Sequence, residues 1–386
     1  MGNTDSQEII SKILGSDWDL ELLLALMRLT LFFILVVFIS VRNVEAESYS
    51  GLVSTISEQE NLVKPTEDGA SLNSNALSDS VRPVQLFSEH TPVSIQSQHP
   101  LELIHLRPQM TTAGTTKEGD SLFSVSLVWS NTLNRRKGYY LIDCETVALD
   151  TGFSYGLSNK LSISGNIPLA YRSGGVTDPW IEDFHSVFGL PQGQRKKVEE
   201  NNYRIEGITE EDDFFSWKED GFGLGSSELR ADYSFYRKVD SVASAFISGG
   251  VPGIGDSFSQ DSVDIALGAI YSKQASFLTI TVGGMYEFYG DTFESGIEYR
   301  THHEMAYLAS EFPIQESVST IVTASYQSAL IDNISHYPIY SVYLDLALRI
   351  HDVGGRSLNI GFRENPGPDS GTIDFAIFSQ LNLPLR

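Results

Sequence analysis

Cysteine is almost absent from this chain of 386 residues, since Cys144 is the only one. A single cysteine excludes an intramolecular disulfide, and we interpret Cys144 as an unpaired residue of the fold and not as a nucleophile. Basic residues are also scarce, because 26 Lys and Arg stand against 50 Asp and Glu, a formal net charge of -24. No nucleic-acid partner is expected, since phosphates require a basic surface.

Long apolar runs are missing as well. The run Leu29–Val41 is about 13 residues long, whereas a membrane-spanning helix takes about 20. A basic residue precedes this run and small residues follow it, which is typical of a secretory signal peptide over residues 27–46. Residues 1–26 are acidic and are interpreted as a misassigned N-terminal extension. The alternative is an uncleaved anchor helix over Leu22–Val41, and either reading predicts export.

The rest of the chain contains repeated alternation of apolar and polar residues. Phe123, Val125, Leu127 and Trp129 alternate with serines, and similar runs recur down to Ile373–Gln380. A period of two is the signature of a strand, and many of these runs have the roughly 9 to 11 residues that cross a bilayer at a tilt. The fold class predicted is all-β: a twelve-stranded antiparallel transmembrane β-barrel over residues 121–386.

The connections between these runs alternate between long and short. The long ones are 131–138, 172–221, 252–262, 290–300, 331–338 and 365–371, and the short ones are 156–160, 237–241, 272–275, 313–317 and 351–356. Outer-membrane barrels of Gram-negative bacteria have short periplasmic turns, longer outer loops and an even number of strands. We therefore expect an outer-membrane protein with both termini in the periplasm. Residues 47–82 are predicted to form a disordered acidic leader, and 83–120 a periplasmic lead-in or plug.

The longest connection, 172–221, is predicted to be an extracellular insertion that contains a helix. Asp178 can cap the helix, Pro179 fits its first turn and Gly189 can end it. An apolar stripe at helical spacing favours a lid or plug against the barrel mouth, with a membrane-lying helix as the alternative. The lid candidates are Trp180, Ile181, Glu182, Phe184, His185, Phe188 and Arg195.

Aromatic residues near the strand ends are expected to form interfacial girdles, although tyrosine is also simply a good strand former. The candidates are Tyr139, Tyr140, Tyr155, Tyr171, Tyr233, Tyr271, Tyr286, Phe288 and Tyr289. Asp143 and Glu145 do not fit this pattern, because they share a face with apolar residues that should meet lipid. Either a bulge switches the face after Glu145, or these acids stand above the hydrocarbon at the outer rim.

Charged residues of both signs fall on the inward faces of the strands. Such residues either pair with one another and fill the lumen or line a narrow wet channel, and pairing is favoured because an unpaired buried charge is costly. Acidic residues outnumber basic residues on these inward faces, so the sequence shows no row of basic side chains that would guide anions through the lumen. The lumen-lining candidates are Arg230, Asp232, Asp264, Glu287, Asp345, Arg349, Arg363 and Asp374.

Several short segments of the sequence resemble those of a family of uncharacterised proteobacterial proteins. They are Trp129–Thr132, Ile142–Glu145, Gly165–Leu169 and Ser173–Arg195, the last with its Glu182, Phe184, His185 and Gly189–Pro191. Together they are similar to domain of unknown function 3187, from about Pro92 to the C-terminus. The resemblance implies an outer-membrane location and no particular activity.

Catalysis is not expected. Glu182 and His185 share a helix face, and His302 and His303 adjoin Glu304, but neither group comes with a recognisable nucleophile or a third metal ligand. No cofactor and no metal are therefore expected. The favoured function is a narrow channel for small solutes or a structural surface component. The alternatives are a lipid-acting barrel enzyme and a soluble periplasmic β-sandwich. Expected partners are outer-membrane lipid and, in transit, periplasmic chaperones and the barrel-assembly machinery, with a monomer as the final state.

The barrel and the sandwich predict different behaviour in membrane preparations. A barrel should stay in the membrane fraction during carbonate extraction and should migrate differently in gels before and after boiling. Extraction into the carbonate supernatant, with no shift on boiling, would favour the sandwich.

Overall fold

The computed structural model describes residues 92–385, apart from 94, 189–197, 199–201, 218–219, 254–262, 276–277, 291–292, 295, 353 and 366–372. The predicted extension, signal peptide and acidic leader lie outside the described residues. Within the described part, no helix has both the length and the apolar character needed to span a bilayer.

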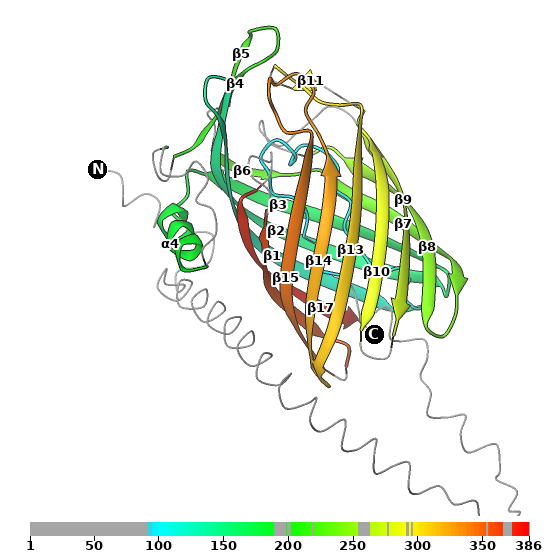
Figure 1. The fold of residues 1–386 in the computed structure, drawn as a ribbon. Helices are drawn as coiled ribbons and strands as arrows, with labels where there is room; N and C mark the ends of the chain where they lie inside the picture. The colour runs from blue at the N-terminus through cyan, green and yellow to red at the C-terminus, as the bar shows by residue number, and fades with distance from the viewer. Residues whose placement is uncertain are drawn as a thin grey trace, which may run out of the picture. The chain divides into compact units, whose positions relative to one another are not determined.

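Twelve long antiparallel strands close into a barrel, which confirms the fold class predicted from alternation (Figure 1). They are β1 (Ser121–Arg136), β2 (Tyr140–Ser158), β3 (Leu161–Ser173), β7 (Ser227–Arg237), β8 (Ser241–Val251), β9 (Asp264–Gln274), β10 (Thr279–Phe288), β13 (His302–Gln315), β14 (Val318–Ser328), β15 (Tyr340–His351), β16 (Ser357–Glu364) and β17 (Phe375–Leu385). Each pairs with the next, and β17 returns to β1 with Leu385 opposite Ser121. Closure leaves this ring without an exposed edge.

The shorter elements lie in two of the long connections. Between β3 and β7 come α4 (Asp178–Phe188), β4 (Arg204–Ile208), β5 (Phe214–Trp217) and β6 (Gly221–Leu224), and between β10 and β13 come β11 (Phe293–Glu294) and β12 (Ile297–Glu298). The helix begins at Asp178, and the carbonyl of Thr177 accepts the first helical hydrogen bond from the Ile181 N–H, so Thr177 takes the capping position one residue before the predicted Asp178. Pro179 lies in the first turn, as predicted, and Gly189 lies outside the described residues. β4 pairs with the first residues of β2, so the sheet continues beyond the wall at that point (Figure 1).

One predicted connection is wrong. The polar stretch after Ser130 was expected to be a loop over 131–138, but β1 and β2 stay paired as far as Arg136 and Tyr140. The turn consists of residues 137–139, with Gly138 at a φ of 85° that favours glycine. Polar residues are tolerated in this stretch because β4 and the insertion, and not lipid, lie against these strand ends.

Burial on the two faces of the wall is the reverse of that in a water-soluble protein. Large apolar side chains that point outward are exposed, among them Leu127, Ile167, Leu229, Leu267 and Leu308. Side chains that point inward are buried and largely polar, among them Ser126, Asn166, Arg230, Ser272, Thr281 and Asn359. An apolar outer band around a polar interior is the arrangement that a wall facing lipid requires.

The aromatic girdle is only partly present. Tyr139, Tyr155, Tyr233, Tyr271 and Phe288 are exposed on the outside, and Tyr171 and Tyr286 are half-buried. Tyr140 and Tyr289 are buried in an apolar cluster with Leu101 and Ile104, so their assignment to the girdle is wrong. Their partners come from distant parts of the chain, which spacing along a strand cannot reveal.

Two inward glycines make room for aromatic rings. A Cβ added to Gly268 would lie 2.3 Å from the ring of Phe246, and one added to Gly283 would lie 2.3 Å from the ring of Tyr307. Real Cβ atoms do not approach so closely, so the rings lie along the wall only because these positions lack a side chain.

Adjacent glycines in β10 test this packing. We expect Gly283→Ala to destabilise the barrel by about 1–3 kcal/mol, because overpacking forces the Tyr307 ring to move. Gly284→Ala is the matched control, since its Cβ would be 3.7 Å from the nearest atom. The urea midpoint of the heat-modifiable band measures both, and equal midpoints for the two variants would contradict the packing.

Candidate functional site: the barrel interior

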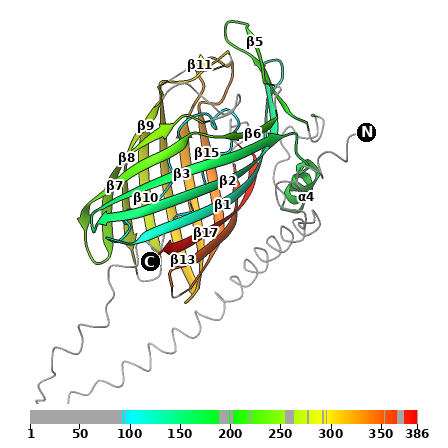
Figure 2. The ribbon, with the colours of Figure 1, turned by 180° about the vertical axis from the view of Figure 1, so that it is seen from behind.

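The chain that precedes β1 lies inside the barrel. Almost every side chain of residues 95–116, named here the inner segment, is buried or half-buried (cyan in Figures 1 and 2). The buried side chains include ionisable ones, namely His99, Glu102, His105 and Arg107. A segment with this composition becomes buried only where the surrounding wall supplies polar partners.

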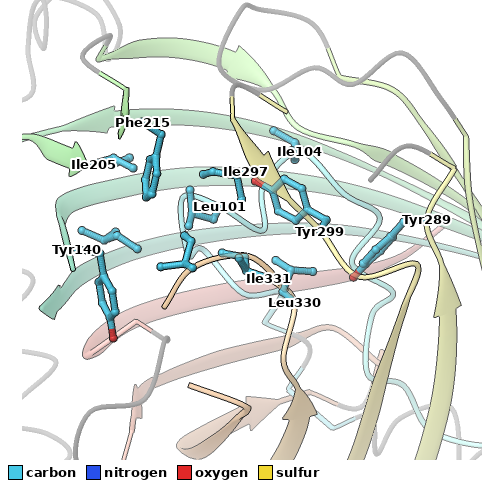
Figure 3. Close-up of a cluster of buried hydrophobic side chains, with 12 residues drawn as sticks. Leu101, Ile104, Tyr140, Ile205, Phe215, Tyr289, Ile297, Tyr299, Leu330 and Ile331 are labelled. Carbon is cyan, nitrogen blue, oxygen red and sulfur yellow. The ribbon is translucent and has the colours of Figure 1, made fainter. Parts of the chain in front are cut away.

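The inner segment extends between the two ends of the barrel. Leu101 and Ile104 join an apolar cluster with residues of the long connections, including Phe215, Tyr299 and Leu330 (Figure 3). At the other end the Thr116 hydroxyl lies 2.6 Å from that of Ser154. The chain then leaves beside Gly156 on β2, where an added Cβ would lie 2.1 Å from the carbonyl oxygen of Lys117.

Wall side chains bind the backbone of the inner segment. The Arg230 guanidinium donates to the carbonyl of Gln109 over 2.8 Å, and the Tyr307 hydroxyl donates to the carbonyl of Thr111 over 2.6 Å. The backbone N–H groups are held by wall acceptors: Leu106 N–H by Asp264 (2.8 Å), Gln109 N–H by Glu228 (3.3 Å) and Ala113 N–H by Ser272 (3.0 Å). The wall therefore satisfies backbone groups that have no strand partner.

The other predicted lumen charges form ion pairs within the wall. Arg363 makes two hydrogen bonds to Asp345, of 2.6 and 2.8 Å, from the neighbouring strand. Arg349 is 2.8 Å from Glu311 and donates to Asn359. Replacing one member of such a buried ion pair by a neutral residue destabilises the fold by about 3–5 kcal/mol, because the other charge is left uncompensated.

The remaining candidates have different partners. Asp232 pairs with Arg230 at 2.7 Å, and Glu287 accepts from Tyr289 (3.0 Å) and lies 3.1 Å from His303. Asp374 lies apart from the other candidates, just before β17, where its N–H donates to the carbonyl of Asn131. That these residues line a conducting path stays a prediction.

Glu145 faces outward and is nevertheless buried. No bulge switches the face, because β2 stays in register with β1 from Asp143 to Val147. One carboxylate oxygen of Glu145 accepts from the N–H of Val176 (2.9 Å) and from Thr177, and the other accepts from the Trp129 indole (2.8 Å). The prediction of a bulge is therefore wrong, and the backbone of Val176 and Thr177, at the start of the insertion, covers the Glu145 carboxylate.

The first turn of α4 consequently lies against the outside of the wall (Figures 1 and 2). Asn131 donates to Asp178 over 3.0 Å, and the Trp180 ring packs edge-on against Phe375. Ile181 is buried, and Glu182 is half-buried. The side chains of Phe184, His185 and Phe188, and all of Arg195, lie outside the described residues, so a lid role for this set stays a prediction.

Sequence reasoning missed Glu228, Ser272 and Tyr307 as ligands of the inner segment. Their alternation with outward apolar residues was a usable signal for the inward face. Nothing in the spacing indicated that their partner would be the backbone of residues 106–113, because a backbone group carries no sequence signature.

With this geometry established, the class of protein is a closed β-barrel whose interior holds the inner segment of the same chain. The chain belongs to the family described as "Protein of unknown function (DUF3187)", whose model matches residues 80–382. A search of curated proteins finds no match to the chain.

Among solved structures, the chain resembles the COG4313 outer membrane channel from Pseudomonas putida F1, with 12% identity over 71% of this chain and 98% of that one and a TM-score of 0.49. It also resembles the toluene transporter TodX of Pseudomonas putida, with 10% identity, 77% and 96% coverage and a TM-score of 0.37. The NanC porin matches with 8% identity, 67% and 97% coverage and a TM-score of 0.38. At this level of similarity, the function of this chain does not follow from theirs.

The exposure of residue 110 reports how firmly the inner segment is held. In a Cys144→Ser background, a Met110→Cys thiol should react slowly with a soluble maleimide because the site is buried. Tyr307→Phe removes the hydroxyl that donates to the Thr111 carbonyl and accepts from the Thr111 N–H. A loss of about 1 kcal/mol should raise the labelling rate roughly five-fold. The control is Tyr326→Phe on the outer face. Fast labelling in every variant would mean that the segment is not held inside.

Proposed function

We propose that this chain is an outer-membrane protein, and that its barrel is a narrow channel for small solutes which the inner segment closes. The apolar outer band supports the membrane location, because only a closed barrel or a helix can expose such a surface to lipid. The single observation that carries the channel function is that a separate stretch of polypeptide lies in the lumen and is held there by noncovalent contacts with the wall's inward side chains.

The wall carries small residues at several of the positions where it faces the inner segment. Ser234 and Ser272 contact Ala113, and Gly250 lies against Leu106. A barrel closed permanently by its wall would carry large inward side chains at such positions. Withdrawal of the inner segment would therefore leave a passage through the barrel.

The contacts that hold the inner segment are noncovalent and individually weak. A typical hydrogen bond contributes about 0.5–1.5 kcal/mol net, and one to a charged group about 1.5–3 kcal/mol. Among the described residues, the wall strands pair with one another and not with the inner segment, and the isolated bridge between Glu118 and Gly156 lies just beyond the segment's end. Displacing the segment thus does not require the barrel to unfold.

The orientation proposed for the barrel follows from its ends. Ser121 and Leu385 lie opposite each other, at the end where the short turns after β2 and β7 also lie. With short turns in the periplasm, both ends of the barrel chain are periplasmic and the insertion with α4, β4 and β5 is extracellular. The protein would reach this state as a monomer, through the periplasmic chaperones and the assembly machinery.

A structural role at the cell surface is the second candidate. The observation that favours it is the attachment of the insertion to the outer wall through Glu145, which fixes the start of α4 beside the barrel. Such a barrel would keep its inner segment in place permanently.

Single-channel recording of the full chain in a planar bilayer separates the two candidates. Arg230→Met removes the guanidinium that holds Gln109 and Thr111, so we expect the open probability to rise at least about tenfold. Arg349→Met is the matched control, because that guanidinium binds Glu311 and Asn359 of the wall. Silence of all three proteins, despite a heat-modifiable fold, would contradict the channel.

A further inference from the structure

Part of the lumen wall is apolar. Six inward side chains on four neighbouring strands, β8, β9, β10 and β13, form one buried cluster (positions of the strands in Figure 1). We name this set the apolar wall patch, and its members are Val242, Phe246, Ile270, Met285, Met305 and Tyr307. A polar lumen does not need such a surface to bind water or ions.

The aromatic rings of the patch lie along the wall. Phe246 lies over Gly268 and Tyr307 lies over Gly283, at separations that any larger residue at those glycines would prevent. The patch therefore offers flat aromatic and thioether surface to whatever occupies the lumen, and such surfaces pack well against planar or unbranched apolar groups.

The inner segment occupies the patch in the manner of a ligand. Met110 and Ala113 pack against it. The carbonyls of Gln109 and Thr111, on either side of Met110, accept from Arg230 and Tyr307. The segment thus presents an apolar side chain flanked by carbonyl oxygens, and the wall recognises both features.

The charges beside the patch indicate which solutes would fit. Arg230 already pairs with Asp232 at 2.7 Å, and Glu228 binds the N–H of Gln109. Two acids beside one base disfavour an additional carboxylate, whereas a neutral carbonyl compound accepts from Arg230 and Tyr307 without adding charge. An amide N–H could also replace that of Gln109 at Glu228.

We propose that the apolar wall patch, with Arg230 and Tyr307 at its edge, is a binding site for a neutral solute that has a flat apolar body and a carbonyl group. The solute competes with residues 109–113 and occupies the patch when the inner segment withdraws. This inference rests on the proposed function, because it names the solute class of the same lumen.

The rate at which a soluble maleimide labels Met110→Cys, in the Cys144→Ser background, measures this competition and does not depend on whether the protein conducts. Phenylacetamide should accelerate labelling saturably. A solute that binds only the barrel from which the inner segment has withdrawn increases the population of that state, in which residue 110 is exposed to the maleimide. At ten times its dissociation constant the acceleration should be roughly tenfold. Acetamide, which lacks the apolar body, and phenylacetate, which is charged, should each give less than about twofold at equal concentration.

Variants locate the effect at the patch. Phe246→Ala should abolish the acceleration by phenylacetamide, whereas Phe235→Ala, on the exposed outer face, should retain it. Met285→Gln provides a second test should Phe246→Ala fail to fold. Acceleration that persists unchanged in the folded patch variants would overturn the assignment.

The failure of this site and the failure of the channel are distinguishable. Conductance by Arg230→Met, with no more acceleration by phenylacetamide than by acetamide, would overturn the site and leave the channel intact. Saturable acceleration in a protein that never conducts would support the site and contradict the channel.

Discussion

Enclosed polar groups need partners, and the structure depends on how this barrel supplies them. A wall with an apolar exterior turns its polar side chains inward, where a buried group without a hydrogen bond costs free energy. The inner segment supplies part of these partners through its backbone, as the contacts of Asp264 with Leu106 and of Arg230 with Gln109 illustrate. At these contacts, wall and segment satisfy each other's polar groups.

The two sides of the wall meet this need differently. On β13 to β16, charged residues of different strands pair with one another on the inner face: Arg363 with Asp345, and Arg349 with Glu311. On β7 to β9, Glu228, Arg230 and Asp264 bind the inner segment. The ion pairs on β13 to β16 do not depend on the inner segment. If the segment withdrew, the polar groups on β7 to β9 would bind water or solute in its place. This asymmetry makes a closed barrel compatible with opening.

The sequence predicted the wall well because strand periodicity is a local property. Alternation around Leu229–Phe235 identified both faces of β7, and Asp178 with Pro179 located the start of α4 to within one residue. Contacts between distant segments were not predictable in the same way. The partner of outward-facing Glu145 is the backbone at Val176 and Thr177, and Tyr140 packs near Leu101. The leucines of residues 101–106 follow neither strand nor helix spacing clearly, so the prediction of a lead-in or plug over 83–120 could not name the wall residues that the inner segment contacts.

The position of the inner segment is the central claim, and a disulfide tests it most directly. The hydroxyls of Thr112 and Ser272 lie 3.0 Å apart. In membranes containing the Cys144→Ser protein, the pair Thr112→Cys with Ser272→Cys should therefore crosslink on mild oxidation. The matched pair Thr112→Cys with Tyr271→Cys, whose second residue points outward, should not. Equal crosslinking of both pairs, or none in the first, would contradict a segment held inside the barrel.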